Sequence, residues 1–121
     1  MKMNDKPRYT FHYTPAEHFL TFGPSEGYTP PHFAEEGFIH CTDGAGNMAA
    51  VANRFYKDDP RDFLVLYIDK TRVKSPIKYE DPGEIYPHIY GPLNQDAIVD
   101  KRPASREPDG TFMVMPEPTA F

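Results

Sequence analysis

The sequence predicts one small α+β domain in which about six short strands form a small mixed, split sheet, with two or three helices on its flanks. Three observations support this prediction. The chain has 121 residues, 39% of them hydrophobic, which suits one domain with one core. Residues 63–68 form a continuous apolar run of strand length, and residues 48–55 carry apolar side chains at helical spacing. The 14 prolines and 8 glycines indicate many turns between short elements.

The first strand is expected over residues 8–13, because aromatic side chains occupy every second position there. His12 falls between two of them, so its side chain is predicted to point away from the aromatic face. A first helix is expected to follow, with Thr14 as N-cap, Pro15 at the first helical position and Glu17 placed to close a capping box.

A second short helix is expected to begin at residues 29–30 and to end at Gly37. Residues 38–42 then read as a strand whose two faces are both expected to be buried. The helix with the clearest apolar periodicity in the sequence is expected next, with Thr42 or Asp43 as its N-cap. Its apolar positions recur at i, i+3, i+4 and i+7, which are Met48, Val51, Ala52 and Phe55.

The apolar run at residues 63–68 predicts a central strand that is covered on both faces. Four shorter strands are expected at residues 77–80, 89–90, 97–101 and 111–115. No internal repeat or long linker divides the chain, so residues 1–121 are predicted to form a single domain, with loose ends at residues 1–7 and 116–121.

Charge and composition limit the kinds of partner that the protein is expected to bind. The net charge is -5, so no basic surface is expected for nucleic acid or an anionic membrane. No stretch approaches the ~20 apolar residues that a membrane span needs. The single cysteine, Cys41, excludes an intrachain disulfide, and a cytoplasmic protein is predicted. A small-molecule ligand is the expected partner, and the oligomeric state is left open.

Three histidines are candidates for a site, because each stands in a segment of apolar or aromatic residues: His12, His40 and His88. A buried imidazole needs a partner for each ring nitrogen, so either a site role or a satisfied core histidine would explain them. His18 and His32 are predicted to lie at the surface.

Other chemistries fit less well. No complete phosphate-binding loop occurs, and Gly44-Ala45-Gly46 is only a fragment of one. Cys41 and His40 are neighbours on a strand and point to opposite faces, which favours a buried free cysteine over a nucleophile with its base. No metal site is predicted, although the three histidines with Glu80 leave a His-ligated metal-dependent enzyme as one alternative.

Four strings of residues carry a family resemblance: Phe11-His12, Glu36-Gly37-Phe38-Ile39-His40-Cys41-Thr42, Lys78-Tyr79-Glu80 and Pro87-His88-Ile89-Tyr90-Gly91-Pro92-Leu93. With their spacing, they cover nearly the whole chain. They resemble the bacterial family known as domain of unknown function 952. That family looks related in fold to ADP-ribosyltransferases, whose NAD cleft lies between two small sheets.

The resemblance implies a site and a role for each residue in it. His12, His40 and His88 would be the catalytic residues, and Thr42, Tyr90 and Glu80 would bind the substrate. In the transferases a first-strand histidine binds ribose, the role that would fall to His12. His40 with Thr42 would support the nicotinamide, and His88 with Tyr90 would lie near the late-strand glutamate position, for which Glu80 is a candidate substitute.

A pyrophosphate would need compensating charge, for which the candidates are Arg54, Lys78 and the loop at Gly44. NAD is therefore a possible substrate, and no other cofactor is implied. Three hypotheses remain: an enzyme or relic that binds or processes NAD, ADP-ribose or a related nucleotide; a non-catalytic small-molecule or protein-binding module; and the metal-dependent enzyme.

Overall fold

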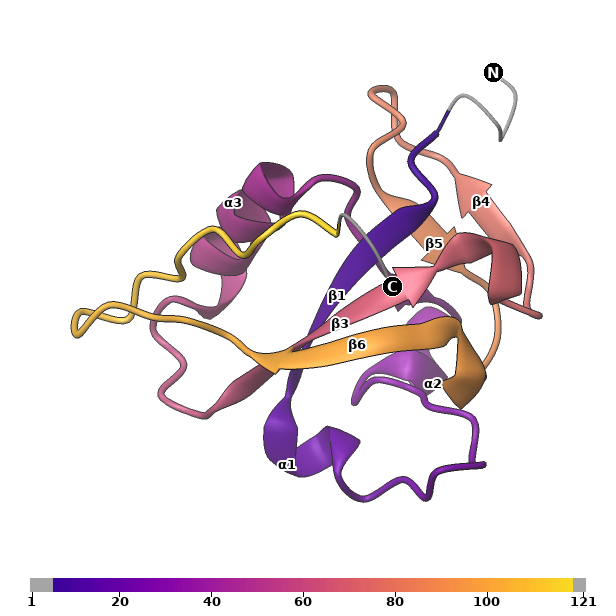
Figure 1. Ribbon diagram of the computed structural model, residues 1–121, viewed down its shortest axis with the longest axis horizontal. Helices are drawn as coiled ribbons and strands as arrows, with labels where there is room; N and C mark the ends of the chain where they lie inside the picture. The colour runs from indigo at the N-terminus through magenta and orange to yellow at the C-terminus, as the bar shows by residue number, and fades with distance from the viewer. Residues whose placement is uncertain (1–5, 119–121) are drawn as a thin grey trace.

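The computed structural model describes residues 6–118, and two three-stranded sheets organise them (Figure 1). In the first sheet the strand order is β1 (Tyr9–Pro15), β3 (Phe63–Asp69) and β6 (Ile98–Pro103). In the second sheet the order is β2 (Ile39–His40), β5 (Pro87–Ile89) and β4 (Ile77–Tyr79). The prediction of about six short strands in a split sheet is confirmed. All of the strand pairings are antiparallel, however, which corrects the expected mixed sheet.

The predicted central strand, β3, pairs with β1 on one side and β6 on the other. Its alternate side chains enter two different cores, as an apolar run covered on both faces should. Phe63, Val65 and Tyr67 pack toward α3 (Ala45–Tyr56). Leu66 and Ile68 pack toward the second sheet.

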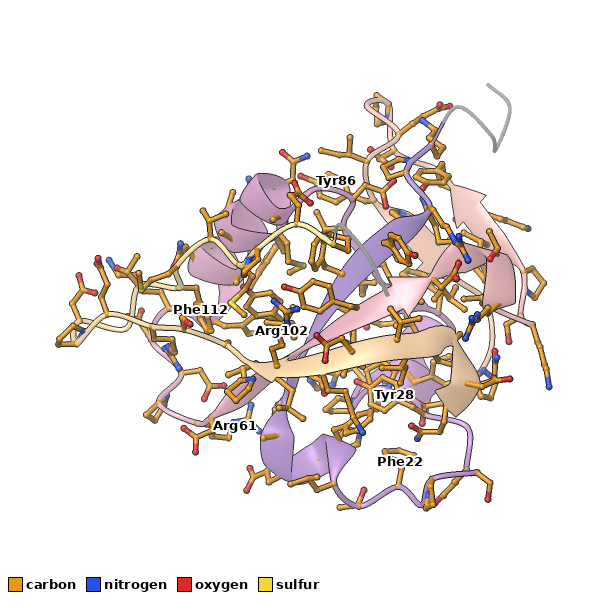
Figure 2. The ribbon with its side chains drawn as sticks, viewed as in Figure 1. Phe22, Tyr28, Arg61, Tyr86, Arg102 and Phe112 are labelled. Atoms are coloured by element: carbon orange, nitrogen blue, oxygen red, sulfur yellow. The ribbon has the colours of Figure 1, made fainter. Side chains whose placement is uncertain are left out.

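The second core fills the space between the two sheets. Ile39 and Cys41 enter it from β2 and the residue after its end, and Ile89 enters it from β5. Tyr28 is fully buried there and lies beside Phe22, with 5.4 Å between the ring centroids (Figure 2). The inner face of the second sheet is therefore buried.

The outer face of β2 differs from the prediction that both faces would be buried. The His40 side chain is 55% exposed, because it points away from the core between the sheets that Ile39 enters. Phe38, on the same face, is half-buried.

The first two helices are single turns, α1 (Ala16–Phe19) and α2 (Phe33–Glu36). The predicted capping box at the start of α1 is wrong. Thr14 and Pro15, which were expected to begin the helix, belong to β1 and pair with two residues of β3. Helix α2 ends at Gly37 as predicted but begins at Phe33 rather than at residues 29–30, and the φ of 81° at Gly37 lies in the left-handed region that glycine adopts readily.

Helix α3 spans 12 residues, and its apolar face lies on the first sheet. Met48 and Ala52 are buried as predicted, but Phe55 is 65% exposed. Tyr56, four residues after Ala52, continues the buried stripe instead and packs against Phe63. Phe55 is consequently turned toward solvent.

The C-terminal segment crosses α3, as its yellow trace shows in Figure 1. The strand predicted at residues 111–115 is wrong, because only one bridge forms, between Arg106 and Phe112. The backbone of Phe112 bonds instead to the Asn53 side chain on α3.

Of the predicted loose ends, residues 1–5 and 119–121 lie outside the described residues. The nearest described residues make defined contacts. The Pro116 carbonyl accepts a hydrogen bond from the Tyr67 hydroxyl, and the Lys6 ammonium lies 2.9 Å from the Glu84 carboxylate. Among residues 6–118, no helix is long and apolar enough to cross a membrane.

Candidate functional site

Two adjoining cavities open between the α2–β2 segment and α3. Their volumes are about 350 and about 440 Å³. They form one cleft, here called the α2–α3 cleft, because six residues line both: His32, Glu36, His40, Thr42, Val51 and Tyr56. His12 lines the first cavity and His88 the second. Segments far apart in the sequence thus bring all three predicted histidines and Thr42 to one cleft.

The base of the cleft lies where the two sheets meet. Phe11 of β1 and Thr42, two residues beyond the end of β2, form an isolated antiparallel bridge with backbone hydrogen bonds in both directions, of 3.0 and 2.9 Å. This bridge brings His12 next to the end of β2. The strand pairing therefore explains why two histidines 28 positions apart meet.

His12 is 6% exposed, and both of its ring nitrogens have protein partners. Nδ1 donates to the backbone carbonyl of His40 over 2.6 Å, so Nε2 of the neutral ring accepts from the Tyr28 hydroxyl over 2.8 Å. Burial lowers the pKa of His12 to about 4. The ring is therefore neutral at physiological pH and holds the main chain of His40 in place.

His40 and His88 lie directly opposite each other on β2 and β5. Their ring centroids are 5.1 Å apart with the planes at 77°, an edge-to-face arrangement. Phe38 stacks on His88 at 4.1 Å with nearly parallel planes. Burial, and next the neighbouring His40, lower the pKa of His88.

Glu80 and Tyr90 lie beside His88 on the outer side of the second sheet. The Tyr90 hydroxyl donates to Oε1 of Glu80, and the same oxygen is 3.5 Å from Nδ1 of His88. This hydrogen bond lowers the pKa of Glu80 and raises that of Tyr90. Neither residue is among those that line the α2–α3 cleft, so their predicted role in substrate binding remains a prediction.

Arg54, a candidate for phosphate compensation, lines the cleft from α3. Lys78 does not, and its ammonium lies over the Tyr90 ring at 5.1 Å. The Gly44 loop begins α3, but the backbone N–H of Ala45 donates to the Glu117 carboxylate over 3.1 Å. The protein's own carboxylate thus occupies that helix end, and Arg54 is the candidate cation that reaches the cleft.

Sequence reasoning missed several residues of the cleft. Tyr56, Tyr86, Asp81 and Arg61 all line it, and Figure 2 labels Arg61 and Tyr86 on well-separated parts of the chain. The helical spacing could have predicted Tyr56, since it lies four residues after Ala52 and therefore on the same face of the helix. The others carry no local signal, because loops place them.

The two remaining histidines and the cysteine lie in different surroundings. His18 is half-buried rather than exposed, since Nε2 bonds to the Thr29 carbonyl over 2.7 Å and the ring packs on Phe22. His32 is exposed as predicted, yet it stands at the mouth of the cleft. Cys41 is buried and burial raises the pKa of its thiol, which agrees with a free core cysteine.

A buried polar cluster that the sequence did not suggest joins the two sheets. The Lys70 ammonium, just after β3, lies 3.3 Å from both carboxylate oxygens of Asp43. The Tyr79 hydroxyl of β4 donates to the same carboxylate over 2.5 Å. Burial lowers the pKa of Lys70. None of the three lines the α2–α3 cleft, so the cluster stabilises the fold around the site.

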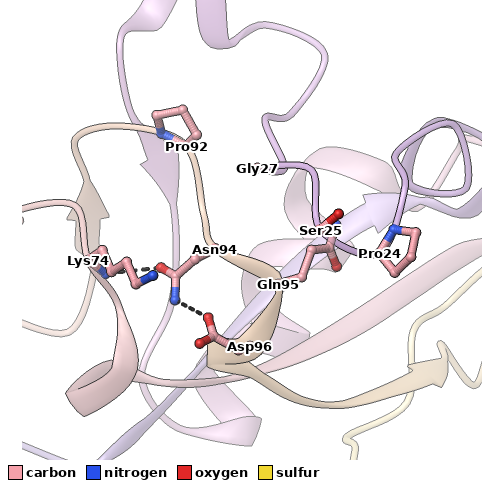
Figure 3. A pocket seen from close by; sticks show the side chains of 8 residues that line it. All are labelled: Pro24, Ser25, Gly27, Lys74, Pro92, Asn94, Gln95 and Asp96. Atoms are coloured by element: carbon pink, nitrogen blue, oxygen red, sulfur yellow. Dashed lines mark hydrogen bonds between the residues drawn. The ribbon is translucent and has the colours of Figure 1, made fainter.

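Neither a metal centre nor a second hollow competes with the α2–α3 cleft within residues 6–118. Among residues 6–118, no group of three or more histidine, cysteine or acidic side chains is arranged to hold a metal ion. A separate surface hollow of about 430 Å³ is lined by a different set of residues, which Figure 3 shows: Pro24, Ser25, Gly27, Lys74, Pro92, Asn94, Gln95 and Asp96. It contains no histidine, and Asn94 bonds within it to Lys74 and Asp96. The α2–α3 cleft is the better candidate.

The model of the family described as protein of unknown function (DUF952) matches residues 13–101. The chain belongs to this family. Two solved structures share the fold: protein CC0527 from Caulobacter crescentus and a double mutant of it, with TM-scores of 0.72 and 0.71. Each is 15% identical to this chain, and each alignment covers 87% of this chain and 93% of the other. No curated protein matches the chain. The DUF952 resemblance is thereby confirmed.

Proposed function

We propose that the α2–α3 cleft of this DUF952 protein binds NAD, ADP-ribose or a related nucleotide. One observation carries the proposal: His12, His40, Thr42 and His88, which the family strings single out, line one cleft. The volumes of its two cavities, about 350 and about 440 Å³, fall within the usual range for small-molecule sites. The two small sheets that meet beside the cleft support an ADP-ribosyltransferase-like arrangement.

The lining of the cleft suits the parts of such a nucleotide. Tyr56 and Tyr86 offer aromatic surface for a base. Arg54 is exposed and forms no ion pair within residues 6–118, so its guanidinium is free to bind a phosphate. His40 offers an exposed imidazole for ribose hydroxyls. Arg61, by contrast, is already bound to Asp59 over 2.8 Å.

Within this proposal, His12 acts as a positioning residue. Both of its ring nitrogens already have partners, so a ribose would have to displace the His40 carbonyl or the Tyr28 hydroxyl to bind it. The 2.6 Å bond to His40 instead fixes the strand that presents the His40 ring. A substitution of His12 should therefore disturb binding through His40.

A non-catalytic binding module remains the second candidate. The late motif offers His88 and Tyr90 where the transferases carry a glutamate, and an imidazole does not supply the same fixed negative charge. Release of nicotinamide from NAD separates the two candidates: the transferase-like reading predicts release, and the binding module predicts saturable binding without it.

Binding is tested by calorimetric titration with ADP-ribose and NAD, alongside NMR spectra of the five histidine imidazoles. We expect saturable binding that moves the signals of His40 and His88 and leaves His18 in place. Arg54→Ala should weaken binding about 10- to 100-fold, since a hydrogen bond to a charged group contributes about 1.5–3 kcal/mol. Lys57→Ala, which removes the same charge from the same helix end outside the cleft, is the matched control.

The proposal fails if the folded protein binds neither ligand at millimolar concentration. It also fails if Lys57→Ala weakens binding as much as Arg54→Ala, because the effect would then reflect net charge rather than a site on α3.

A further inference from the structure

The pair formed by His40 and His88 is the part of the cleft with the most defined chemistry. The two residues are direct partners across β2 and β5, and their rings lie 5.1 Å apart. Phe38 touches both, stacked on His88 at 4.1 Å and edge-on to His40 at 4.7 Å. Strand pairing and aromatic packing thus hold two imidazoles side by side at the wall of one cavity.

A carboxylate lies near one nitrogen of each imidazole, but only the one beside His40 forms a hydrogen bond with the ring. Oε2 of Glu36 lies 3.1 Å from Nε2 of His40, and Oε1 of Glu80 lies 3.5 Å from Nδ1 of His88. No hydrogen bond within residues 6–118 engages Nδ1 of His40 or either ring nitrogen of His88. A carboxylate behind an imidazole selects the tautomer and stabilises the imidazolium that forms when the ring takes a proton. The Glu36–His40 pair is therefore equipped for proton transfer through Nδ1 of His40, and His88 keeps ring nitrogens that no hydrogen bond within residues 6–118 engages.

The two rings cannot both be charged without repulsion, because they are so close. Burial and the neighbouring His40 lower the pKa of His88, while Glu80 opposes this effect. Glu36 faces His40, and Asp81 and Arg54 line the same cavity. Repulsion between two imidazolium rings at this distance favours a pair with one neutral and one protonated ring, which is the state that a general base and a general acid require.

We propose that His40 and His88 act as a general base and general acid that hydrolyse a small ribonucleoside 2′,3′-cyclic phosphate. This inference rests on the proposed nucleotide cleft. Nicotinamide leaves NAD as a neutral molecule and needs no proton, so cleavage of NAD would make no use of an acid. A ribose alkoxide that leaves phosphorus does need a proton, and the pair supplies both the proton acceptor and the proton donor.

The step is balanced with one water. The neutral imidazole takes a proton from water as the water oxygen forms a bond to phosphorus. The bond between phosphorus and one ribose oxygen breaks, its electron pair stays on that oxygen, and the oxygen takes the proton of the imidazolium. The product is a nucleoside monophosphate, and proton exchange with solvent restores the pair. Arg54 would stabilise the charge on the phosphoryl oxygens.

The charge of the protein favours a mononucleotide over an RNA chain. The net charge is -5, and Glu36 and Asp81 stand at the cleft, so a polyanion would be repelled. Among the described residues that line the second cavity, Arg54 is the one lysine or arginine, which suits a single phosphate group.

The test is hydrolysis of adenosine 2′,3′-cyclic phosphate, followed by phosphorus NMR in the presence of EDTA. We expect turnover to a nucleoside monophosphate with a bell-shaped dependence of rate on pH. His40→Gln and His88→Gln should each lower the rate by about 10²–10⁴-fold, the usual contribution of general acid–base catalysis, and each should remove one limb of the bell. Lys57→Ala should keep the full rate and the same profile.

Binding of ADP-ribose is measured on the same preparations. Binding of ADP-ribose without hydrolysis at any pH overturns the proposed acid–base role of His40 and His88 but not the proposal that the cleft binds nucleotides. Hydrolysis that survives both histidine substitutions also overturns it. Hydrolysis that both substitutions abolish, without any binding of ADP-ribose or NAD, supports the pair and overturns the proposed function. Loss of both activities in the folded wild-type protein overturns both. Circular dichroism establishes that each variant is folded.

Discussion

Acidification should destabilise this protein through His12. The side chain is 6% exposed, and its pKa is lowered to about 4 from the usual 6.5. Above pH 6.5 the ring is neutral in both the folded and the unfolded chain, so it has no effect on stability. Between pH 6.5 and pH 4 the His12 imidazole binds a proton in the unfolded chain but not in the folded chain, which favours unfolding. Stability should therefore fall as pH is lowered through this window.

The size of the effect follows from the shift. One pKa unit corresponds to about 1.4 kcal/mol, so His12 should reduce the free energy of unfolding by about 2 kcal/mol between pH 7 and pH 5, and by about 3 kcal/mol below pH 4. His88 acts in the same direction, because its pKa is also lowered. Several carboxylates have pKa values lowered from their ordinary values, which also favours the folded state at the higher pH: Asp59, Asp69, Glu80 and Asp81.

Urea unfolding followed by circular dichroism at pH 7 and pH 5 measures this difference. In His12→Asn the loss of stability between the two pH values should be smaller than in the wild type by about 2 kcal/mol. His32→Asn, which removes an exposed histidine, should lose as much as the wild type. Equal losses in His12→Asn and the wild type would refute a neutral, buried His12. An NMR titration of the His12 imidazole in the wild type tests the same point even if His12→Asn does not fold.

Three further substitutions should lower stability in urea unfolding. Asp43→Asn leaves the buried Lys70 ammonium without its carboxylate, so we expect a loss of about 3–5 kcal/mol. Tyr28→Phe removes the hydroxyl that donates to His12 and leaves Nε2 unpaired, at a cost of about 1–3 kcal/mol. Gly110→Ala should cost about 1–3 kcal/mol, because φ is 95° and the new Cβ would lie 2.5 Å from a backbone carbonyl oxygen.

Matched substitutions separate these effects from general sensitivity to mutation. Asp58→Asn alters an exposed aspartate and should change stability by less than about 0.5 kcal/mol. Gly46→Ala lies in α3 with open space around the new Cβ and should stabilise the protein by about 0.5–1 kcal/mol. If Asp43→Asn proved as mild as Asp58→Asn, the buried pair would contribute nothing. A neutral Gly110→Ala would exclude strain at that turn.

Local patterns were sufficient for the elements with strong periodicity. The apolar run of β3 and the stripe at Met48 and Ala52 led directly to the central strand and the long helix. Phe55 was wrongly placed in the core, because a helical stripe can continue at either of two adjacent positions. The geometry of the sheet beneath α3 decides between them, and Tyr56 takes the buried one.

The strand pairings overrode local signals at two places. Thr14 and Pro15 form a good helix start by themselves, yet pairing with β3 extends β1 through both. Residues 111–115 follow a turn and are mostly apolar, as in a short strand, but Phe112 bonds to Asn53 of α3 and remains outside both sheets. In each case a hydrogen-bond partner distant in sequence determined the outcome.

By itself, the sequence determined an α+β chain with about six short strands, the family strings and the three histidines, because each of these follows from neighbouring residues. Only the tertiary structure decided what the histidines can do. His12 is buried and hydrogen-bonded at both ring nitrogens, whereas His40 and His88 form a pair beside a cleft. The burial of an imidazole depends on what the sheets place against it. Those neighbours, which include Tyr28 and Arg54, come from segments that local periodicity does not connect.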